Sequence, residues 1–188
     1  MSESVRKLEF VPILETSESV WEEIRLLRNT DNIRKYMYTD HIIEKDEHLR
    51  WLSSLRSSEA NKVWVIQYFG KPIGIVSLNN INRRQRTADW AFYIREDLQG
   101  KGLGAAIEFQ LIELAFNDEG LEKLNCEVLE LNPGVVKLHM KFGFKQEGIR
   151  RKNILKEGRR IDVHLLGILK EEWAEIKPQL QRRAERMQ

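Results

Sequence analysis

The chain has a single cysteine, Cys126, so it cannot form an internal disulfide. No apolar run approaches the roughly 18–20 residues that span a bilayer, and the polar first residues lack the apolar core of a signal peptide. The net charge is only +2, which gives no overall attraction for a nucleic acid. The four histidines, at 41, 48, 139 and 164, lack the close spacing of metal ligands. We therefore expect a cytoplasmic protein with no metal site, no membrane contact and no nucleic-acid partner.

What the chain does have is enough apolar sequence for one sizeable core. Of its 188 residues, 41% are hydrophobic and 32% are charged, a balance typical of a folded globular protein. No linker divides it, so we expect a single domain over 1–188, with a charged helical tail over 171–188. Cys126 lies in an apolar run, which favours a buried, inert thiol over a nucleophile.

The spacing of the apolar residues predicts a mixed α/β chain. Strands are expected at 8–14, 63–69, 73–78, 87–94, 124–131, 144–150 and 161–169. Helices are expected from Ser17 or Ser19, from Asp46, over 103–117, after Asn132, and in the tail, where Pro178 should interrupt the last one. A hairpin turn is expected at Gly70-Lys71-Pro72. The resulting order is β-α-α-β-β-β-α-β-α-β-β.

A glycine-rich stretch, Leu98-Gln99-Gly100-Lys101-Gly102-Leu103-Gly104, lies between a predicted strand and a predicted helix. Backbone N–H groups and the positive end of a helix dipole make such a turn an anion site. A P-loop is excluded because no Ser or Thr follows Lys101. The dinucleotide fingerprint is excluded because the third glycine comes one residue early. The stretch does match the pattern Q/R-x-x-G-x-G/A.

That pattern resembles the pyrophosphate loop of the GCN5-related N-acetyltransferases, the GNAT family. The later run Asn132-Pro133-x-x-x-x-Leu138-x-x-Lys141-Phe142-Gly143-Phe144 resembles the same family's strand–helix–strand signature. The resemblance implies an α/β GNAT fold, in which helices flank a mixed sheet splayed between its fourth and fifth strands. It also implies acetyl-CoA as co-substrate and direct attack by an amine in a ternary complex.

The resemblance assigns residues to the donor and to the chemistry. The implied donor-binding residues are Phe92, Tyr93, Ile94, Gln99, Gly100, Lys101, Gly102, Leu103, Gly104 and Asn132. Glu127 is the implied base, with a strand-edge carboxylate in a salt bridge as the alternative, and Glu130 is a weaker candidate on the other face. His139 stands where the family usually has a tyrosine acid. A surface histidine on an amphipathic helix is its alternative.

The acceptor segments resemble a narrower group, the N-acetyltransferases of the pseudaminic acid pathway. Its substrate is UDP-4-amino-4,6-dideoxy-N-acetyl-β-L-altrosamine, so the implied partner is a nucleotide sugar. The residues that resemble its acceptor site are Arg28, Met37, Tyr38, His48 and Trp51. Arg28 would meet the diphosphate. His48 would bind the sugar or act as a base through water, unless it only positions a helix, and the aromatic residues could equally be core.

Three other interpretations stay open. Spermidine acetyltransferases and ribosomal-protein N-terminal acetyltransferases also carry a Gln-Gly-Lys-Gly type of loop. A non-catalytic acyl-CoA-binding or interaction module could use the same fold. A homodimer is a further possibility that the sequence leaves open.

Overall fold

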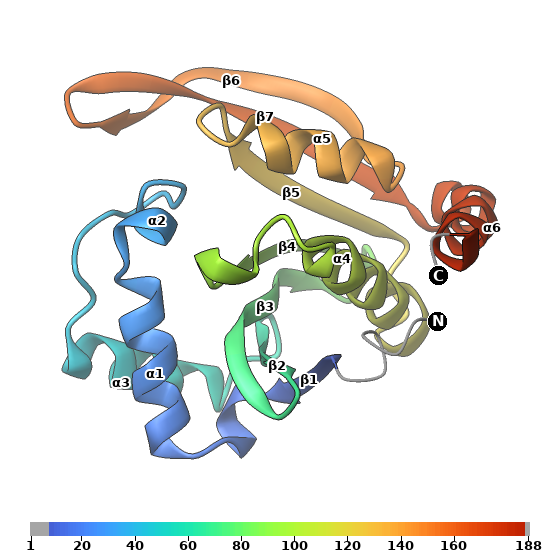
Figure 1. Ribbon diagram of the computed structural model, residues 1–188. Coiled ribbons are helices and arrows are strands. Elements are labelled where there is room, and N and C mark those ends of the chain that lie inside the picture. Colours follow the sequence, from blue (N-terminus) through green and yellow to red (C-terminus); the bar gives the residue numbers. More distant parts are fainter. Residues whose placement is uncertain (1–7, 187–188) are drawn as a thin grey trace.

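The computed structural model describes residues 8–186, which fold around one seven-stranded sheet of order β1-β2-β3-β4-β5-β7-β6 (Figure 1). The strands are β1 (Leu8–Pro12), β2 (Lys62–Tyr68), β3 (Lys71–Asn82), β4 (Thr87–Ile94), β5 (Lys123–Leu129), β6 (Lys145–Lys156) and β7 (Arg159–Leu169). The helices are α1 (Glu18–Arg28), α2 (Asp31–Arg34), α3 (Lys45–Leu55), α4 (Leu103–Glu113), α5 (Pro133–Lys141) and α6 (Lys170–Arg186). None of the helices in this described part is long and apolar enough to cross a bilayer.

The sheet changes character between β4 and β5. Its other neighbouring strands pair antiparallel, whereas β4 and β5 run parallel because the crossover helix α4 joins them. Their pairing covers only Thr87↔Lys123, Ala88↔Leu124 and Asp89↔Asn125, after which the two strands diverge. The predicted GNAT fold, with a mixed sheet splayed between the fourth and fifth strands and flanked by helices, is confirmed.

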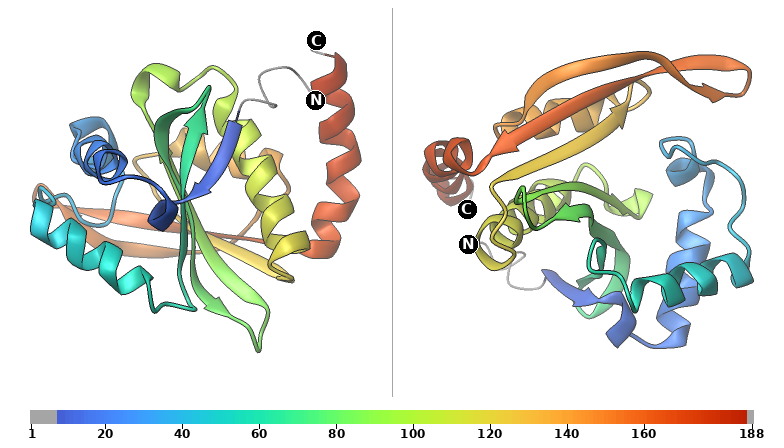
Figure 2. Two further views of the ribbon diagram at one scale, coloured as in Figure 1. Left: turned by 90° about the horizontal axis from the view of Figure 1, so that it is seen from below. Right: turned by 180° about the vertical axis from the view of Figure 1, so that it is seen from behind.

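Helices cover both faces of the sheet, and strand alternation assigns each face its own core. Trp64 and Ile66 of β2 point into the main core, which α4, α5 and α6 cover. Val63 and Val65 of the same strand point into a second core with α1 and α3. Figure 2 shows α1 and α3 on one side of the sheet and α4 and α6 on the other. The sheet therefore has two faces, which we call the α1–α3 face and the α4–α5 face.

Several predicted boundaries were wrong. The β2–β3 turn is at Phe69-Gly70, both with positive φ, and Lys71 already belongs to β3. Strands β3 and β6 are longer than their apolar cores because backbone pairing continues through polar residues. The last helix runs through Pro178 instead of stopping there. Its side chains Trp173, Ile176 and Leu180 pack on the main core, and this burial offsets the hydrogen bond that proline removes.

Gly74 lies where strands β3 and β4 approach too closely to leave room for a side chain. A Cβ at this residue would lie 2.0 Å from the carbonyl oxygen of Tyr93 on the paired strand β4. We expect Gly74→Ala to destabilise the protein by about 3 kcal/mol, since neither backbone can give way without breaking the β3–β4 ladder. Thermal unfolding would measure this. The control is Gly134→Ala in α5, where a Cβ would meet nothing within 4 Å and where alanine should be neutral or stabilising by about 0.5–1 kcal/mol.

Candidate active site

The glycine stretch forms the turn between β4 and α4. Gly100 and Gly102 have φ of +73° and +81°, and Gly102 caps the N-terminus of α4. A Cβ on either glycine would meet no atom within 4 Å, so the loop presents bare backbone to open space. The Gln99 side chain donates to the carbonyl of Ile94 at 3.3 Å and ties the loop to the end of β4. This geometry suits a pyrophosphate on the helix N-terminus.

The second element of the site is the free edge of β4. From Trp90 to Ile94 this strand pairs with β3 on one side, while its pairing with β5 has already ended at Asp89. Its main-chain groups on the β5 side are therefore available to an extended ligand, as the donor assignment of Phe92, Tyr93 and Ile94 requires. The Phe92 ring stacks on the Trp90 ring with centroids 5.6 Å apart.

Glu127 lies across the divergence from β4, two residues beyond the last β4–β5 pair. Its carboxylate accepts a hydrogen bond from the Tyr38 hydroxyl. It also forms an ion pair with Arg150, whose Nη1 lies 2.6 Å from Oε1. Burial raises the pKa of Tyr38, and the hydrogen bond to Glu127 raises it further. The structure thus joins two predicted site residues that are 89 positions apart in the sequence. It also gives Glu127 the ion pair that its alternative interpretation expects.

Arg28 lies on the same face, beside Tyr93. Its Nη2 donates to the Thr39 carbonyl at 2.9 Å, and its buried Nη1 has no hydrogen-bond partner among the described residues. Burial lowers the pKa of Arg28, and burial raises the pKa of Tyr93. An unpaired buried guanidinium nitrogen has a donor to offer to an anionic ligand.

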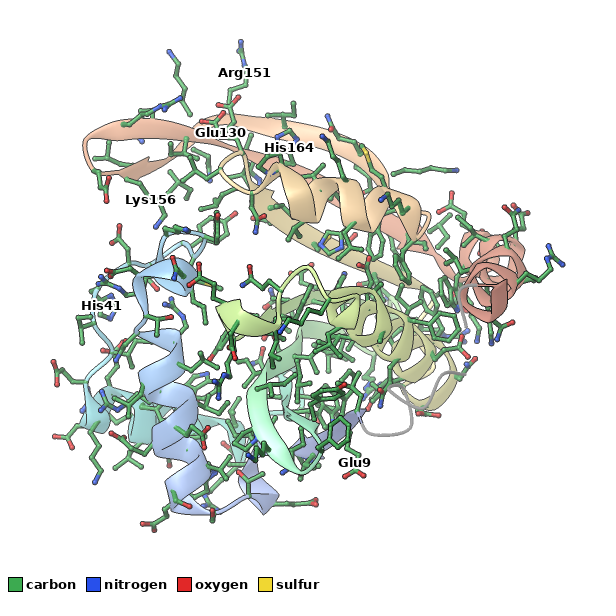
Figure 3. The ribbon with its side chains drawn as sticks, viewed as in Figure 1. Glu9, His41, Glu130, Arg151, Lys156 and His164 are labelled. Atoms are coloured by element: carbon green, nitrogen blue, oxygen red, sulfur yellow. The ribbon has the colours of Figure 1, made fainter. Side chains whose placement is uncertain are left out.

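The β6–β7 hairpin reaches over to the segment after α2. Lys156 is buried, and its Nζ lies 3.3 Å from the Arg34 carbonyl and 3.5 Å from the Asp40 carboxylate. Figure 3 shows Lys156 pointing from the hairpin toward α2, whereas Glu130 lies near the β6–β7 layer. The segment after α2 therefore bridges the two diverging parts of the sheet.

The other predicted acceptor residues are not gathered at Glu127. His48 is 6% exposed, lies 5.2 Å from the Trp51 ring, and lines a cavity of about 320 Å³ between α1 and α3 with Trp21 and Glu22. Burial lowers the pKa of His48. Trp51 packs on the second core. Met37 follows α2, in the turn that also carries Tyr38. Roles for His48, Trp51 and Met37 at the acceptor stay predictions.

On the α4–α5 face, His139 is not on the surface. It is 3% exposed, and its Nδ1 lies 2.8 Å from Oε1 of Glu108, which is fully buried. Glu108 is a residue that the sequence interpretation missed. A signal was available, because Glu108 lies one turn from Gly104 and Ile112 on the apolar side of an otherwise uncharged helix start.

Asn132 precedes α5 and its carbonyl accepts from the N–H groups of Val135 and Val136, although its side chain makes no capping bond. Cys126 is buried, and burial raises the pKa of its thiol. No group of three or more metal-binding side chains occurs within the described residues 8–186. The candidate site thus combines a glycine loop suited to an anion, a free strand edge and two carboxylate-centred groups.

Comparisons with known proteins point to one family. The family described as an acetyltransferase (GNAT) domain matches residues 17–165. Spermidine N(1)-acetyltransferase of Vibrio cholerae is 28% identical over 151 residues, which cover 80% of this chain and 87% of that protein. The acetyltransferase PseH of Campylobacter jejuni is 27% identical over 126 residues, which cover 65% of this chain and 77% of that protein. A crystal structure of the V. cholerae spermidine N-acetyltransferase with CoA and spermine superposes with a TM-score of 0.82 at 25% identity, covering 90% of this chain and 99% of that one.

A substitution in the glycine loop tests whether it holds the donor. We expect Gly102→Val to weaken binding of acetyl-CoA at least tenfold in calorimetry, because a branched side chain would fill the space before the helix N-terminus. The control is Gly70→Val, at the β2–β3 turn, which has a similar φ of +71° and equally open surroundings. Both variants should lose similar stability, so equal affinities in the two would show that the loop is not the donor site.

Proposed function

The chain belongs to the GNAT acetyltransferase family, and from that premise we propose that it acetylates a primary amine on a small molecule by direct attack on acetyl-CoA. The divergence of β4 from β5 after Asp89 carries this proposal. It leaves a free strand edge beside the anion loop, with a carboxylate across the gap. Together these features provide a place for an extended acyl donor and a base for an amine.

The donor would lie along β4 with its pyrophosphate on the loop. Backbone N–H groups from Gln99 to Gly104 and the N-terminus of α4 would hold the phosphates. A backbone N–H on the free edge of β4 would polarise the thioester carbonyl. Loss of one such donor typically costs about 2.7–4 kcal/mol of transition-state stabilisation.

Glu127 would remove the proton from the attacking amine. An amine must be neutral to attack, and a carboxylate within reach, directly or through one water, can accept its proton. The Tyr38 hydroxyl and Arg150 each bond one oxygen of the carboxylate and orient it at the gap. Arg150 is exposed on β6, so an incoming amine can displace it from one carboxylate oxygen at little cost.

A polyamine is the acceptor that the comparisons favour. The spermidine N-acetyltransferase of V. cholerae matches this chain over more of its length than PseH does, and the structure with CoA and spermine shares its fold. A polyamine offers a primary amine, as the chemistry requires. We place this acceptor ahead of the nucleotide sugar on the strength of those relatives.

The charges of the α1–α3 face favour a second candidate, a nucleotide-linked amino sugar. Glu127 is paired with Arg150, Asp40 with Lys156, and Asp31 with Arg34, which satisfies those carboxylates. Arg28 keeps a buried donor without a partner in the described part of the chain. A polycation would meet paired carboxylates and an unpaired guanidinium, whereas a diphosphate would complete the hydrogen bonding of Arg28.

One assay separates these possibilities. Release of the CoA thiol from acetyl-CoA would be measured with spermidine, with UDP-4-amino-4,6-dideoxy-N-acetyl-β-L-altrosamine and with N-terminal peptides of ribosomal proteins. If only one of these acceptors gives fast release of the CoA thiol, that acceptor shows the class of substrate. If the chain binds acetyl-CoA but no amine stimulates thiol release, the enzymatic proposal is wrong and the fold serves as a binding module.

The role of Glu127 as base predicts a pH-dependent defect. Glu127→Gln should lower kcat by about 10²–10⁴-fold at neutral pH. The loss should shrink as the pH rises, because the acceptor amine then becomes neutral without help. Glu147→Gln is the control, since Glu147 also forms an ion pair across strands, with Lys123 at 2.6 Å. A small loss for Glu127→Gln that is the same at every pH would instead assign Glu127 to structure.

Arg28 distinguishes the two acceptors by the sign of the effect. With a nucleotide sugar, Arg28→Met should raise the acceptor KM by about 10–100-fold, because a charge-assisted hydrogen bond is worth about 1.5–3 kcal/mol. With spermidine, the same variant should leave KM unchanged or lower it, since a repelling charge is gone. Arg86→Met, which removes an arginine paired with Glu122, is the control and should change neither value.

A further inference from the structure

The buried contact between Glu108 and His139 is a feature that the reaction described so far does not use. Glu108 is 0% exposed and His139 is 3% exposed, and their facing atoms, Oε1 and Nδ1, are 2.8 Å apart. The second carboxylate oxygen, Oε2, is buried and has no hydrogen-bond partner in the part of the chain that the structure describes. Two ionisable groups are costly to bury, so their retention in the core calls for a reason.

The Glu108–His139 pair lies at the point where the sheet opens. The His139 ring contacts the ring of Trp90 with centroids 4.9 Å apart. Trp90 is the first residue of β4 beyond the last β4–β5 pair, at Asp89. Glu127 is on the opposite face, because residues alternate along β5 and its neighbours Cys126 and Val128 point into the main core beneath α4. The pair and Glu127 therefore flank the gap from opposite sides.

An acyl donor on this site would bring its thioester to the same place. Its phosphates belong at the loop, which follows the C-terminal end of β4. From there an extended chain would run back along the free edge of β4, past Ile94 and Phe92, toward Trp90. The unpaired stretch is five residues long, which at about 3.3 Å per residue spans roughly 16 Å. A donor arm of about this length would bring the leaving sulfur beside Trp90, whose ring contacts His139.

The protonation of the Glu108–His139 pair follows from its burial. Burial disfavours a net charge, so the pair is most stable when it is neutral as a whole. A proton on Oε2 would have no acceptor, because that oxygen is buried without a partner in the described residues. The neutral pair is therefore either a carboxylate with an imidazolium or a carboxylic acid that donates from Oε1 to Nδ1. In both forms the other ring nitrogen, Nε2, carries a proton. A lone buried histidine would have no such bias, because either tautomer would be neutral.

We propose that Glu108 is a positioning residue that keeps a transferable proton on His139 Nε2 for the departing CoA thiolate. The inference rests on the proposed function, because it assigns a step of that reaction. When the C–S bond breaks, its electron pair stays on sulfur, and the Nε2 proton moves to sulfur to give the thiol. Nδ1 then keeps or receives the proton it shares with Glu108, so the imidazole ends neutral and the carboxylate ends charged. Solvent returns one proton to the pair before the next turnover, which balances the proton that the amine gives to its base.

The surroundings of the Glu108–His139 pair contain few competing groups. Trp90 and Phe144 contact the His139 ring as aromatic neighbours. The nearby titratable group on β5 is Cys126, whose thiol pKa is raised first by burial and then by the charge of Glu108. Burial also raises the pKa of Glu108 itself, and the hydrogen bond from His139 opposes that rise. Cys126 therefore stays a thiol and does not take the proton.

Glu108→Gln tests the proposal, because glutamine keeps the shape and can donate to Nδ1 but cannot release a proton. With acetyl-CoA and whichever acceptor in the panel the wild-type chain uses, kcat should fall by about 10²-fold. The KM for acetyl-CoA should stay unchanged, since the lost interaction exists only in the transition state. Glu113→Gln, on the same helix and bonded to Trp173 and Lys177, is the control and should keep the wild-type kcat.

The dependence of the Glu108 effect on His139 is tested in the double variant. His139→Phe leaves the Glu108 carboxyl without its partner and should lower the thermal stability, whereas His139→Phe with Glu108→Met removes both polar groups and should recover it. In a His139→Phe background, Glu108→Gln should cost no further kcat. A Glu108→Gln variant with wild-type kcat and pH profile, or with an equal loss in both backgrounds, would overturn the proposal.

A measurement without turnover separates this proposal from the acetyltransferase activity. NMR of protein carrying heavy-nitrogen histidine reports which ring nitrogens are protonated. His139 Nε2 should carry a proton at neutral pH in the wild type. A spectrum in which Nε2 is unprotonated at neutral pH would refute the role of Glu108, whichever acceptor the chain acetylates. A failure of every amine to release CoA would instead refute the proposed function.

Discussion

The short pairing of β4 with β5 is the constraint on which the site depends. Three residue pairs hold the two halves of the sheet together, and beyond Asp89 and Asn125 the backbone groups that face each other are left for a ligand. A full ladder would have satisfied those groups internally and closed the sheet. The crossover through α4 keeps the strands parallel and places the glycine loop at the end of the open stretch. The glycine loop and the open strand edge, where we propose that the donor binds, therefore arise from one structural feature.

Strand alternation places the two carboxylate-centred groups on opposite faces of the sheet, one partly exposed and one buried. On the α1–α3 face, Glu127, the proposed base, is partly exposed and is held by Tyr38 and Arg150, and this exposure would suit a group that must meet a solvated amine. On the α4–α5 face, the Glu108–His139 pair is sealed in the core. A proton acceptor for the amine and a proton donor for the sulfur would neutralise each other if they were in contact. The sheet keeps the two proposed groups apart because neighbouring residues of a strand point to opposite faces.

The sequence predicted what depends on local pattern. The glycine loop, the helix after it and the strand that carries Glu127 are each specified within a few residues, and the structure has them where they were expected. The contacts of Tyr38 with Glu127, of Lys156 with Asp40 and of His139 with Glu108 were not predictable, since they join residues 31 to 116 positions apart. Boundaries failed where tertiary packing overrides a local signal, as in α6, where burial of one face carries the helix through Pro178.

The fold and the charge distribution favour different acceptors. Similarity of fold favours a polyamine, whereas the charge around Arg28 favours an anionic acceptor. Likeness to spermidine acetyltransferases rests on 80% of the chain in sequence and 90% in structure. In our proposal the acceptor is recognised by a few side chains from the end of α1, the segment after it and the β6–β7 hairpin, and these can change while the fold persists. Here Arg150 pairs with Glu127, Lys156 pairs with Asp40, and Arg28 keeps a buried nitrogen without a partner in the described residues. A polycationic acceptor would have to overcome that unpaired charge, whereas an anionic group beside the amine would stabilise it. The charge of this face therefore weighs against inferring the acceptor from overall similarity alone.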